Sequence, residues 1–239
     1  MAGMRHIVCM RRLVVDPGRV LAFLLIVASQ LPGPPPPELP VAAGQQLMKS
    51  LDAAAQHSRH LWRDSLPVNR DGTVNAYIEI PRGERRKFEF DMRKQERFID
   101  RVMPDSVGGY PVNYGFVPQT VSYDGDPFDA LVLGPPLRGG TIVTGAIVGL
   151  MHMEDEKGID SKVVLSIRGL DGQASHELTA ADQAQIGDYF RRYKQHEPGK
   201  FSRVPGWDSA ERGRQFVQMT HQFFLACRSS DGKVCHVSQ

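Results

Sequence analysis

The 239-residue sequence predicts a mainly β fold with some helix (α+β), in which short strands close into a small OB-like β-barrel flanked by two helices. Three observations predict this fold. Short runs alternate between apolar and polar residues, tight turns separate these runs, and two amphipathic segments follow near the C-terminus. The apolar share of 41% is sufficient for a real core, and the length suits one domain with additions.

The first two strands are predicted over Val74–Ile80 and Lys87–Asp91, where residues alternate between two faces. Glu79 lies on the polar face of the first strand, and Lys87 and Glu89 share the charged face of the second. Because a short turn joins the two runs, we expect them to pair antiparallel. In an ordinary sheet the charged faces are simply solvated, whereas in a closed barrel they line a polar cavity.

Further strands are predicted over Thr141–Met153 and Lys162–Arg168. The pattern Thr179–Asp182 is typical of a helix N-terminus, because a hydroxyl and a carboxylate three residues apart cap the free backbone N–H groups. A second helix begins around Asp208–Glu211. Its apolar side consists of Phe216, Phe223, Phe224 and Cys227.

Residues 1–30 are predicted to be a signal or targeting segment. Four arginines against Asp16 give the segment a net charge of +3, and the whole chain carries +2, so the remainder is close to neutral at 2 − 3 = −1. The apolar run Val20–Ala28 is too short to span a bilayer but suits a secretory signal, with cleavage near Ser29. A buried core helix is the alternative. A cleaved signal predicts a periplasmic or secreted protein without a stable membrane anchor, and an intact segment predicts a cytoplasmic one.

The rest of the chain divides into three predicted parts. Residues 31–58 form a Pro-rich linker and a short helix over 46–58, residues 59–228 form the globular domain, and residues 229–239 form a C-terminal tail. Cys227 and Cys235 either form a disulfide in an oxidising compartment or remain two separate thiols, and the sequence leaves both open.

The run Asp124–Asp129, with the sequence DGDPFD, is the most informative stretch of the chain. Two unit charges about 4 Å apart repel by roughly 4 kcal/mol at an effective dielectric of about 20. The three carboxylates of this loop must therefore be solvated, protonated or neutralised by cations. Ligands that are all oxygen suit Mg²⁺, Mn²⁺ or Ca²⁺ rather than zinc. A solvated acidic turn is the alternative interpretation of this loop taken alone.

This loop, with Tyr110–Phe116 before it and Met153–Lys162 after it, resembles the soluble family I inorganic pyrophosphatases. The resemblance extends from about His60 to Trp207, and several motifs in the right order are more specific than one loop. The other matching motifs are Tyr77–Pro81, Lys87–Glu89, Asp100–Arg101, Tyr193–Lys194 and Pro205–Trp207.

The resemblance implies an inorganic diphosphatase that hydrolyses pyrophosphate to two orthophosphates by attack of metal-activated water, with Asp126 as general base. It implies several Mg²⁺ ions per active site, with Mn²⁺ as a substitute, and a homo-oligomer, of hexameric size in bacterial relatives. The implied metal ligands are Asp124, Asp129, Asp155, Asp160 and Glu79. The implied substrate-binding residues are Lys87, Arg101, Tyr114, Tyr193 and Lys194, and the supporting residues are Glu89 and Lys162.

Two other classes of function stay open at this point. One is a non-catalytic β-barrel module that binds a metal or phosphate, although a pure Ca²⁺ site needs no lysine or arginine facing the ion. The other is a hydrolase of larger phosphoanhydrides, because the ends of the cavity set the length of the substrate that can enter. Nucleic acid is not expected as a partner, because single-strand binding requires a basic, aromatic-rich face and the loop at Asp124–Asp129 is acidic.

Overall fold

The structure is a computed structural model that describes residues 41–167 and 174–229. The predicted signal segment, most of the predicted linker, Arg168 and nearly all of the predicted tail lie outside the described residues. Within the described ranges, none of the helices combines the length and the apolar character needed to cross a membrane.

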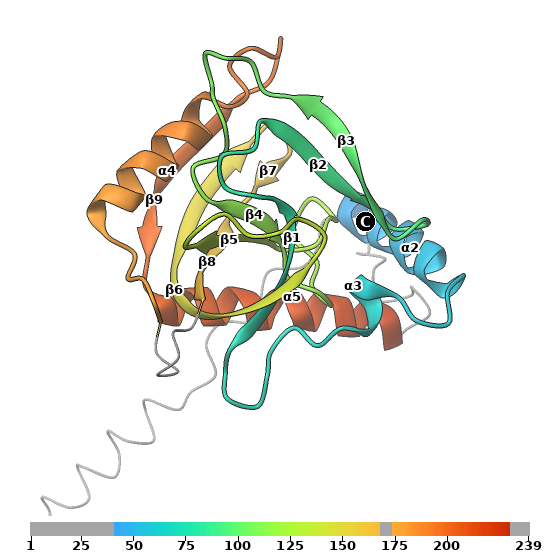
Figure 1. Cartoon of the computed structure of the whole chain (residues 1–239). Helices are drawn as coiled ribbons and strands as arrows, with labels where there is room; N and C mark the ends of the chain where they lie inside the picture. Colours follow the sequence, from blue (N-terminus) through green and yellow to red (C-terminus); the bar gives the residue numbers. More distant parts are fainter. Residues whose placement is uncertain (1–40, 168–173, 230–239) are drawn as a thin grey trace, which may run out of the picture. The chain divides into compact units, whose positions relative to one another are not determined.

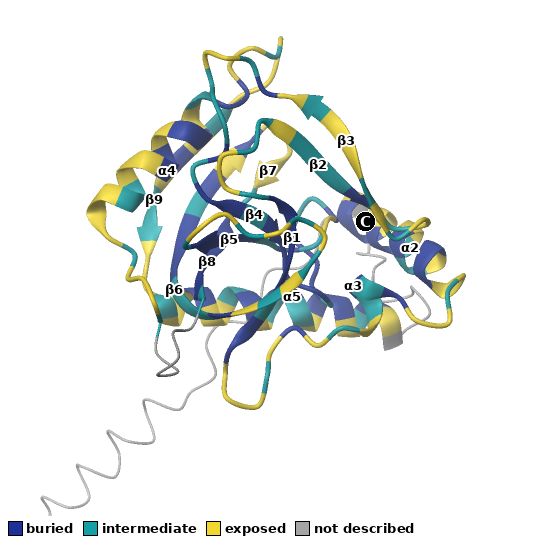
Figure 2. Cartoon of the chain, viewed as in Figure 1, coloured by how far each residue is buried: buried dark blue, intermediate teal, exposed yellow. Residues whose placement is uncertain are grey.

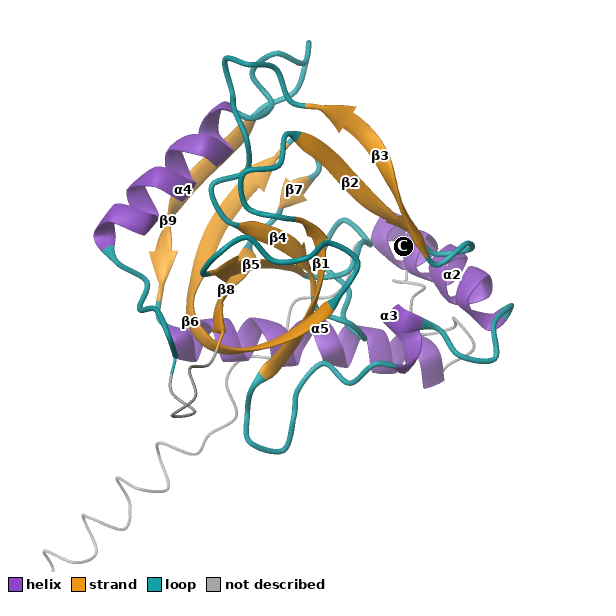
Figure 3. Ribbon diagram, in the orientation of Figure 1, coloured by secondary structure: helices purple, strands orange, loops and turns teal. Residues whose placement is uncertain are grey.

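The described residues form a mixed α+β fold (Figures 1 and 3). The helices are α2 (Val41–Ala55), α3 (Leu61–Asp64), α4 (Ala180–Arg192) and α5 (Ala210–Ser229). The strands are β1 (Val74–Ile80), β2 (Arg86–Asp91), β3 (Glu96–Val102), β4 (Asn113–Phe116), β5 (Asp129–Leu133), β6 (Ile142–Asp155), β7 (Gly158–Ile159), β8 (Lys162–Ile167) and β9 (Ser202–Asp208).

Five strands close a hydrogen-bonded ring in the order β1, β4, β5, β8, β6 and back to β1. Strands β5 and β8 are parallel, and the other neighbours are antiparallel. Gly115 allows β4 to approach β1 closely, since a Cβ atom there would overlap the carbonyl oxygen of Tyr77. The ring confirms the predicted α+β fold with an OB-like closed sheet.

The predicted pairing of the first two strands is wrong. Strand β1 pairs with β6 and β4, so its edges are occupied, and β2 pairs instead with β3 in a separate two-stranded sheet. The β2–β3 turn contains no glycine, which is why the sequence did not reveal it. Asp91 Oδ1 accepts the backbone N–H groups of Arg93 and Lys94, and Gln95 takes the left-handed backbone with φ of 56°.

The barrel is filled by an apolar cluster that includes Val74, Ile78 and Leu165. Helix α5 packs along β6 and β8 and adds Val217 to this cluster. The ring strands are largely buried, whereas β3 is mostly exposed (Figure 2). Strict alternation over Val74–Ile80 would place Ile80 on the same face as Val74, but Ile80 lies in a different apolar cluster, because the register shifts between Ile78 and Ile80.

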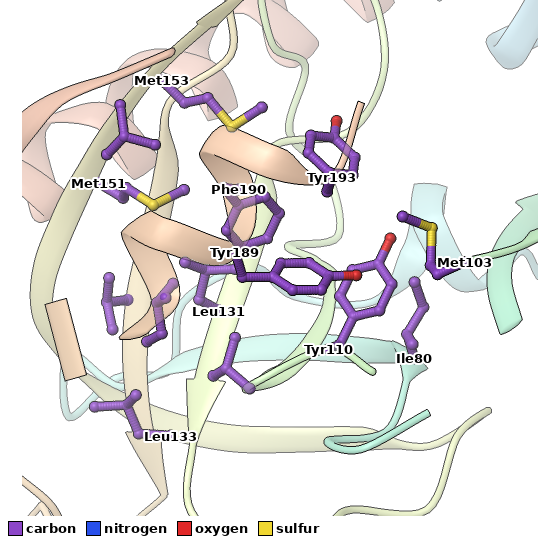
Figure 4. Close-up of a cluster of buried hydrophobic side chains, with 14 residues drawn as sticks. Ile80, Met103, Tyr110, Leu131, Leu133, Met151, Met153, Tyr189, Phe190 and Tyr193 are labelled. Atoms are coloured by element: carbon purple, nitrogen blue, oxygen red, sulfur yellow. The ribbon is translucent and has the colours of Figure 1, made fainter. Parts of the chain in front are cut away.

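A second cluster packs α4 against the sheet. It joins Ile80 and Leu131 to three tyrosines, and Figure 4 shows the rings of Tyr110, Tyr189 and Tyr193 gathered there. Helix α4 begins at the capping box formed by Thr179 and Asp182, as the sequence predicted. This packing fixes the C-terminal end of α4, where Tyr193 emerges.

Helix α2 begins at Val41 and ends at Ala55, so it starts earlier than the predicted helix over 46–58. Leu47 and Ala54 are fully buried in a cluster with Trp62 and Phe224. The helix is therefore packed onto the domain, whereas the sequence predicted it as part of the linker segment.

Helix α5 confirms the second predicted helix, and Phe223, Phe224 and Cys227 are buried as expected. Cys227 is disulfide-bonded. Cys235 lies outside the described residues.

Candidate active site

One cavity of about 440 Å³ gathers the side chains that the sequence singled out. It lies among the β2–β3 hairpin, the ends of β5 and β6, the C-terminal end of α4 and the side of α2. The predicted residues that line it are Glu79, Lys87, Glu89, Arg101, Tyr114, Asp124, Asp126, Asp129, Asp155, Asp160, Tyr193 and Lys194. Lys162, the remaining one, lies behind the wall and contacts two of these carboxylates.

The acidic loop is held by its own backbone. Gly125 takes φ of 88°, the backbone N–H of Asp126 donates to Asp124 Oδ1 at 3.1 Å, and the N–H of Ser122 donates to the Asp126 carbonyl at 2.7 Å. The buried side chain of Phe128 then anchors the loop in the barrel core. The glycine bend and the apolar anchor together direct the loop's carboxylates into the cavity.

A buried lysine ties two carboxylates together from behind. Lys162 Nζ donates to Asp129 Oδ2 at 2.5 Å and to Asp160 Oδ1 at 2.8 Å, and its side chain is 1% exposed. Burial alone would lower the pKa of Lys162, but the carboxylates of Asp129 and Asp160 outweigh it and raise the pKa. Lys162 therefore stays charged and fixes the positions of both aspartates.

The carboxylates nevertheless remain crowded. Burial raises the pKa of Asp160 to about 7, assisted by the charges of Asp129 and Asp124 and opposed by Lys162. Burial also raises the pKa of Asp126 to about 7, assisted by Asp124. Glu79 is 5% exposed, and burial followed by repulsion from nearby carboxylates raises its pKa. The cavity therefore favours protons or cations among these groups.

Two lysines of the cavity are each oriented by a carboxylate. Lys194 Nζ lies 2.6 Å from Asp155 Oδ2, and Lys87 Nζ lies 2.5 Å from Glu89 Oε1. Burial opposes ionisation of Asp155, but the hydrogen bonds from Lys194 and from the Lys157 backbone, together with the charges of Lys194 and Lys162, outweigh it and lower the pKa of Asp155. These cations are thereby pre-positioned for an anionic substrate.

Arg101 and two tyrosines complete the wall. The Arg101 guanidinium lies 3.1 Å from Glu197 Oε1, and Tyr193 is the C-cap residue of α4. Burial is the main reason that the pKa values of Tyr114 and Tyr193 are well above the ordinary value. Both phenols therefore remain protonated and can donate hydrogen bonds.

Several residues that line the cavity were not predicted from the sequence. Lys157 Nζ lies 3.8 Å from both Asp124 Oδ2 and Asp126 Oδ2, and Glu156 accepts from Lys194 at 3.0 Å. Their position inside the acidic run before Asp160 was a usable signal. The contribution of α2 could not be read from the sequence, because it depends on how that helix packs.

The donor set fits hard divalent cations. Within the described residues no three His, Cys, Asp or Glu side chains converge as a preformed metal site. Lysine ammonium groups lie among the carboxylates instead, at Asp124, Asp129 and Asp155. The all-oxygen donors and the raised pKa values of Asp126 and Asp160 indicate that divalent cations would relieve the repulsion.

The inorganic pyrophosphatase family matches residues 76–225 of this chain. The inorganic pyrophosphatase of Saccharolobus solfataricus is 37% identical to it over 152 residues, which are 61% of this chain and 88% of that protein. The inorganic pyrophosphatase of Thermus thermophilus is 40% identical over 153 residues, 60% of this chain and 86% of that protein. A solved structure of an inorganic pyrophosphatase from Coxiella burnetii aligns with a TM-score of 0.62 and 35% identity, covering 67% of this chain and 99% of that one.

Proposed function

We propose that this chain, which belongs to the inorganic pyrophosphatase family and hydrolyses pyrophosphate, does so with several Mg²⁺ ions in the acidic cavity. The residues that would hold the ions are Asp124, Asp129, Asp155, Asp160 and Glu79. When bound, the ions would shield the charge of pyrophosphate and lower the pKa of water. Mn²⁺, which also prefers oxygen ligands, would serve as a substitute.

Asp126 is the proposed general base. It lies in the loop between two proposed ligands, Asp124 and Asp129, and lines the same cavity. Cations beside it would lower its pKa from about 7, so that at neutral pH it is ionised and accepts a proton from the attacking water.

The remaining groups would bind and orient the two phosphates. Lys87, Lys194 and Arg101 supply positive charge, with Arg101 suited to bidentate contact, while Tyr114 and Tyr193 donate hydrogen bonds. Hydrolysis of a phosphoanhydride depends mostly on such positioning and charge stabilisation.

Two residues hold other side chains of the site in position. Glu89 holds Lys87 at 2.5 Å, and Lys162 holds Asp129 and Asp160 from behind. Both are positioning residues, because their partners are the groups that face the cavity.

The observation that carries this proposal is the coexistence of an acidic cluster with Lys87, Lys194 and Arg101 in one cavity. A module that only binds Ca²⁺ has no need for cations facing the ion. A substrate that carries both metal ions and phosphates accounts for both kinds of group.

The test is phosphate release from pyrophosphate by the full chain, first with Mg²⁺ and then with excess EDTA. We expect turnover that EDTA abolishes, and a loss of at least roughly 100-fold in Asp126→Asn with little change in melting temperature, since general bases contribute about 10²–10⁴-fold. Asp188→Asn is the matched control, because Asp188 is exposed on α4 and, among the residues that the structure describes, its side chain pairs only with Arg192. Turnover that survives EDTA, or equal losses in both variants, would contradict the proposal.

We also propose a homo-oligomer, in line with the resemblance to hexameric bacterial relatives. Phe98, Ile99 and Val102 on β3 are exposed large apolar side chains, which supports burial against another copy. Light scattering of the purified protein tests this, and a monomeric mass at micromolar concentration would contradict it.

Export remains a proposal based on residues 1–30. It predicts that protein isolated from its native cells begins near Gln30 and lies outside the cytoplasm. An intact N-terminus on cytoplasmic protein would contradict it.

A further inference from the structure

Helix α2 lies outside the part of the chain that matches the family, which begins at residue 76. One side of the helix nevertheless forms a wall of the active-site cavity, through Gln46, Lys49, Ser50 and Ala53. These residues recur at intervals of three or four positions, so they share one helix face. The cavity of this chain therefore includes an element that the family region alone does not supply.

The helix is fixed in place by two independent contacts. On one side, Ala43 and Leu47 are almost fully buried against the domain, at 1% and 0% exposure. On the other, a Cβ atom at Gly125 would lie 2.8 Å from the Ala43 carbonyl oxygen and 2.6 Å from Gln46 Cβ. Helix α2 thus packs directly on the bend between Asp124 and Asp126.

Lys49 has different surroundings from three other lysines that line the cavity. Lys87, Lys157 and Lys194 each have a carboxylate within 4.0 Å. Lys49 is exposed, and among the described residues no carboxylate lies within ion-pair distance of it. Its charge is therefore available to an anion that enters the cavity, whereas the paired lysines must share theirs.

We propose that α2 is part of the active site of this chain and that Lys49 is an additional substrate-binding residue, contacting a phosphate of pyrophosphate at the cavity wall. The inference rests on the proposed function of the cavity. The contact requires α2 to be docked, so the burial of Leu47 and the packing on Gly125 serve to hold Lys49 over the site.

The test compares three variants of the full chain: Lys49→Gln, Lys49→Arg and Lys94→Gln. Lys94 is the matched control, since its side chain is 69% exposed and does not line the cavity, so its loss changes the net charge equally. We expect Lys49→Gln to raise KM for pyrophosphate by roughly threefold to fivefold with kcat unchanged, the range for one exposed charge contact. Lys49→Arg should retain the original KM, and added salt should shrink the effect.

The affinity of the wild type and the same three variants for imidodiphosphate, a hydrolysis-resistant analogue of pyrophosphate, can be compared without turnover by calorimetric titration in Mg²⁺. Failure of the wild-type chain to release phosphate would defeat the proposed function, while the titration would still test Lys49. An unchanged affinity in Lys49→Gln at low salt, or an equal loss in Lys94→Gln, would overturn the inference.

Discussion

Asp160 should make the metal-free protein less stable as the pH rises. A carboxylate whose pKa is lowered by folding has the opposite effect. The Asp160 side chain is 15% exposed, and its pKa is about 7 against an ordinary 3.8. Between these two values the folded protein retains a proton that the unfolded chain has lost. Folding stability therefore falls as the pH rises through this window.

The two pKa values set the size of the effect. For Asp160 alone they correspond to a loss of roughly 2–3 kcal/mol in unfolding free energy between pH 5 and pH 8. Asp126 acts in the same direction, but its side chain is 53% exposed, so solvent weakens its contribution. His60 acts in the opposite direction, because burial lowers its pKa and protonation at low pH destabilises the fold. The comparison must therefore isolate Asp160.

Urea denaturation in EDTA at pH 5 and pH 8, followed by tryptophan fluorescence, provides that comparison for the wild type and Asp160→Asn. Trp62 is 1% exposed and reports the loss of the core. We expect the wild type to lose roughly 2–3 kcal/mol relative to the variant over this range, and Mg²⁺ to remove most of the difference. A wild-type unfolding free energy that stays constant or rises relative to that of Asp160→Asn between pH 5 and pH 8 would refute the reasoning.

Two other predictions concern the same charges. Lys162→Met should destabilise the metal-free protein by about 3–5 kcal/mol, because it leaves Asp129 and Asp160 without their buried counter-ion; urea denaturation at pH 8 measures this, and a loss below about 1 kcal/mol would argue against the buried pair. Millimolar Mg²⁺ should raise the wild-type melting temperature, because it binds only the folded cavity, and an unchanged melting temperature in a calorimetric scan would count against a multi-metal site.

Much of the fold could be predicted from the sequence because its signals are local. The alternation in Val74–Ile80 marked β1, and the capping pattern at Thr179 marked the start of α4. Strand pairing is not local, so the β2–β3 hairpin was missed, since its turn relies on the side chain of Asp91 rather than on glycine. Strand β9 was also missed, because Pro205 weakens a strand signal.

The candidate site was predictable where charged motifs are dense. The loop at Asp124–Asp129 and the acidic run ending at Lys162 stand out by composition, and the fold brings them into one cavity. The packing of α2 beside them was not predictable. A short amphipathic helix after a Pro-rich segment gives no indication of the surface that it covers. The burial of Leu47 and the packing of Ala43 and Gln46 on Gly125 reveal it in the structure.

The central claim is that divalent cations and pyrophosphate share the acidic cavity. A crystal structure with Mn²⁺ and imidodiphosphate, using the anomalous signal of manganese, tests it most directly. The account predicts several manganese peaks within ligand distance of Asp124, Asp129, Asp155 and Asp160, with the analogue between them and Lys87, Arg101 and Lys194. Manganese bound outside this cavity, or an analogue bound without metal contact, would contradict it.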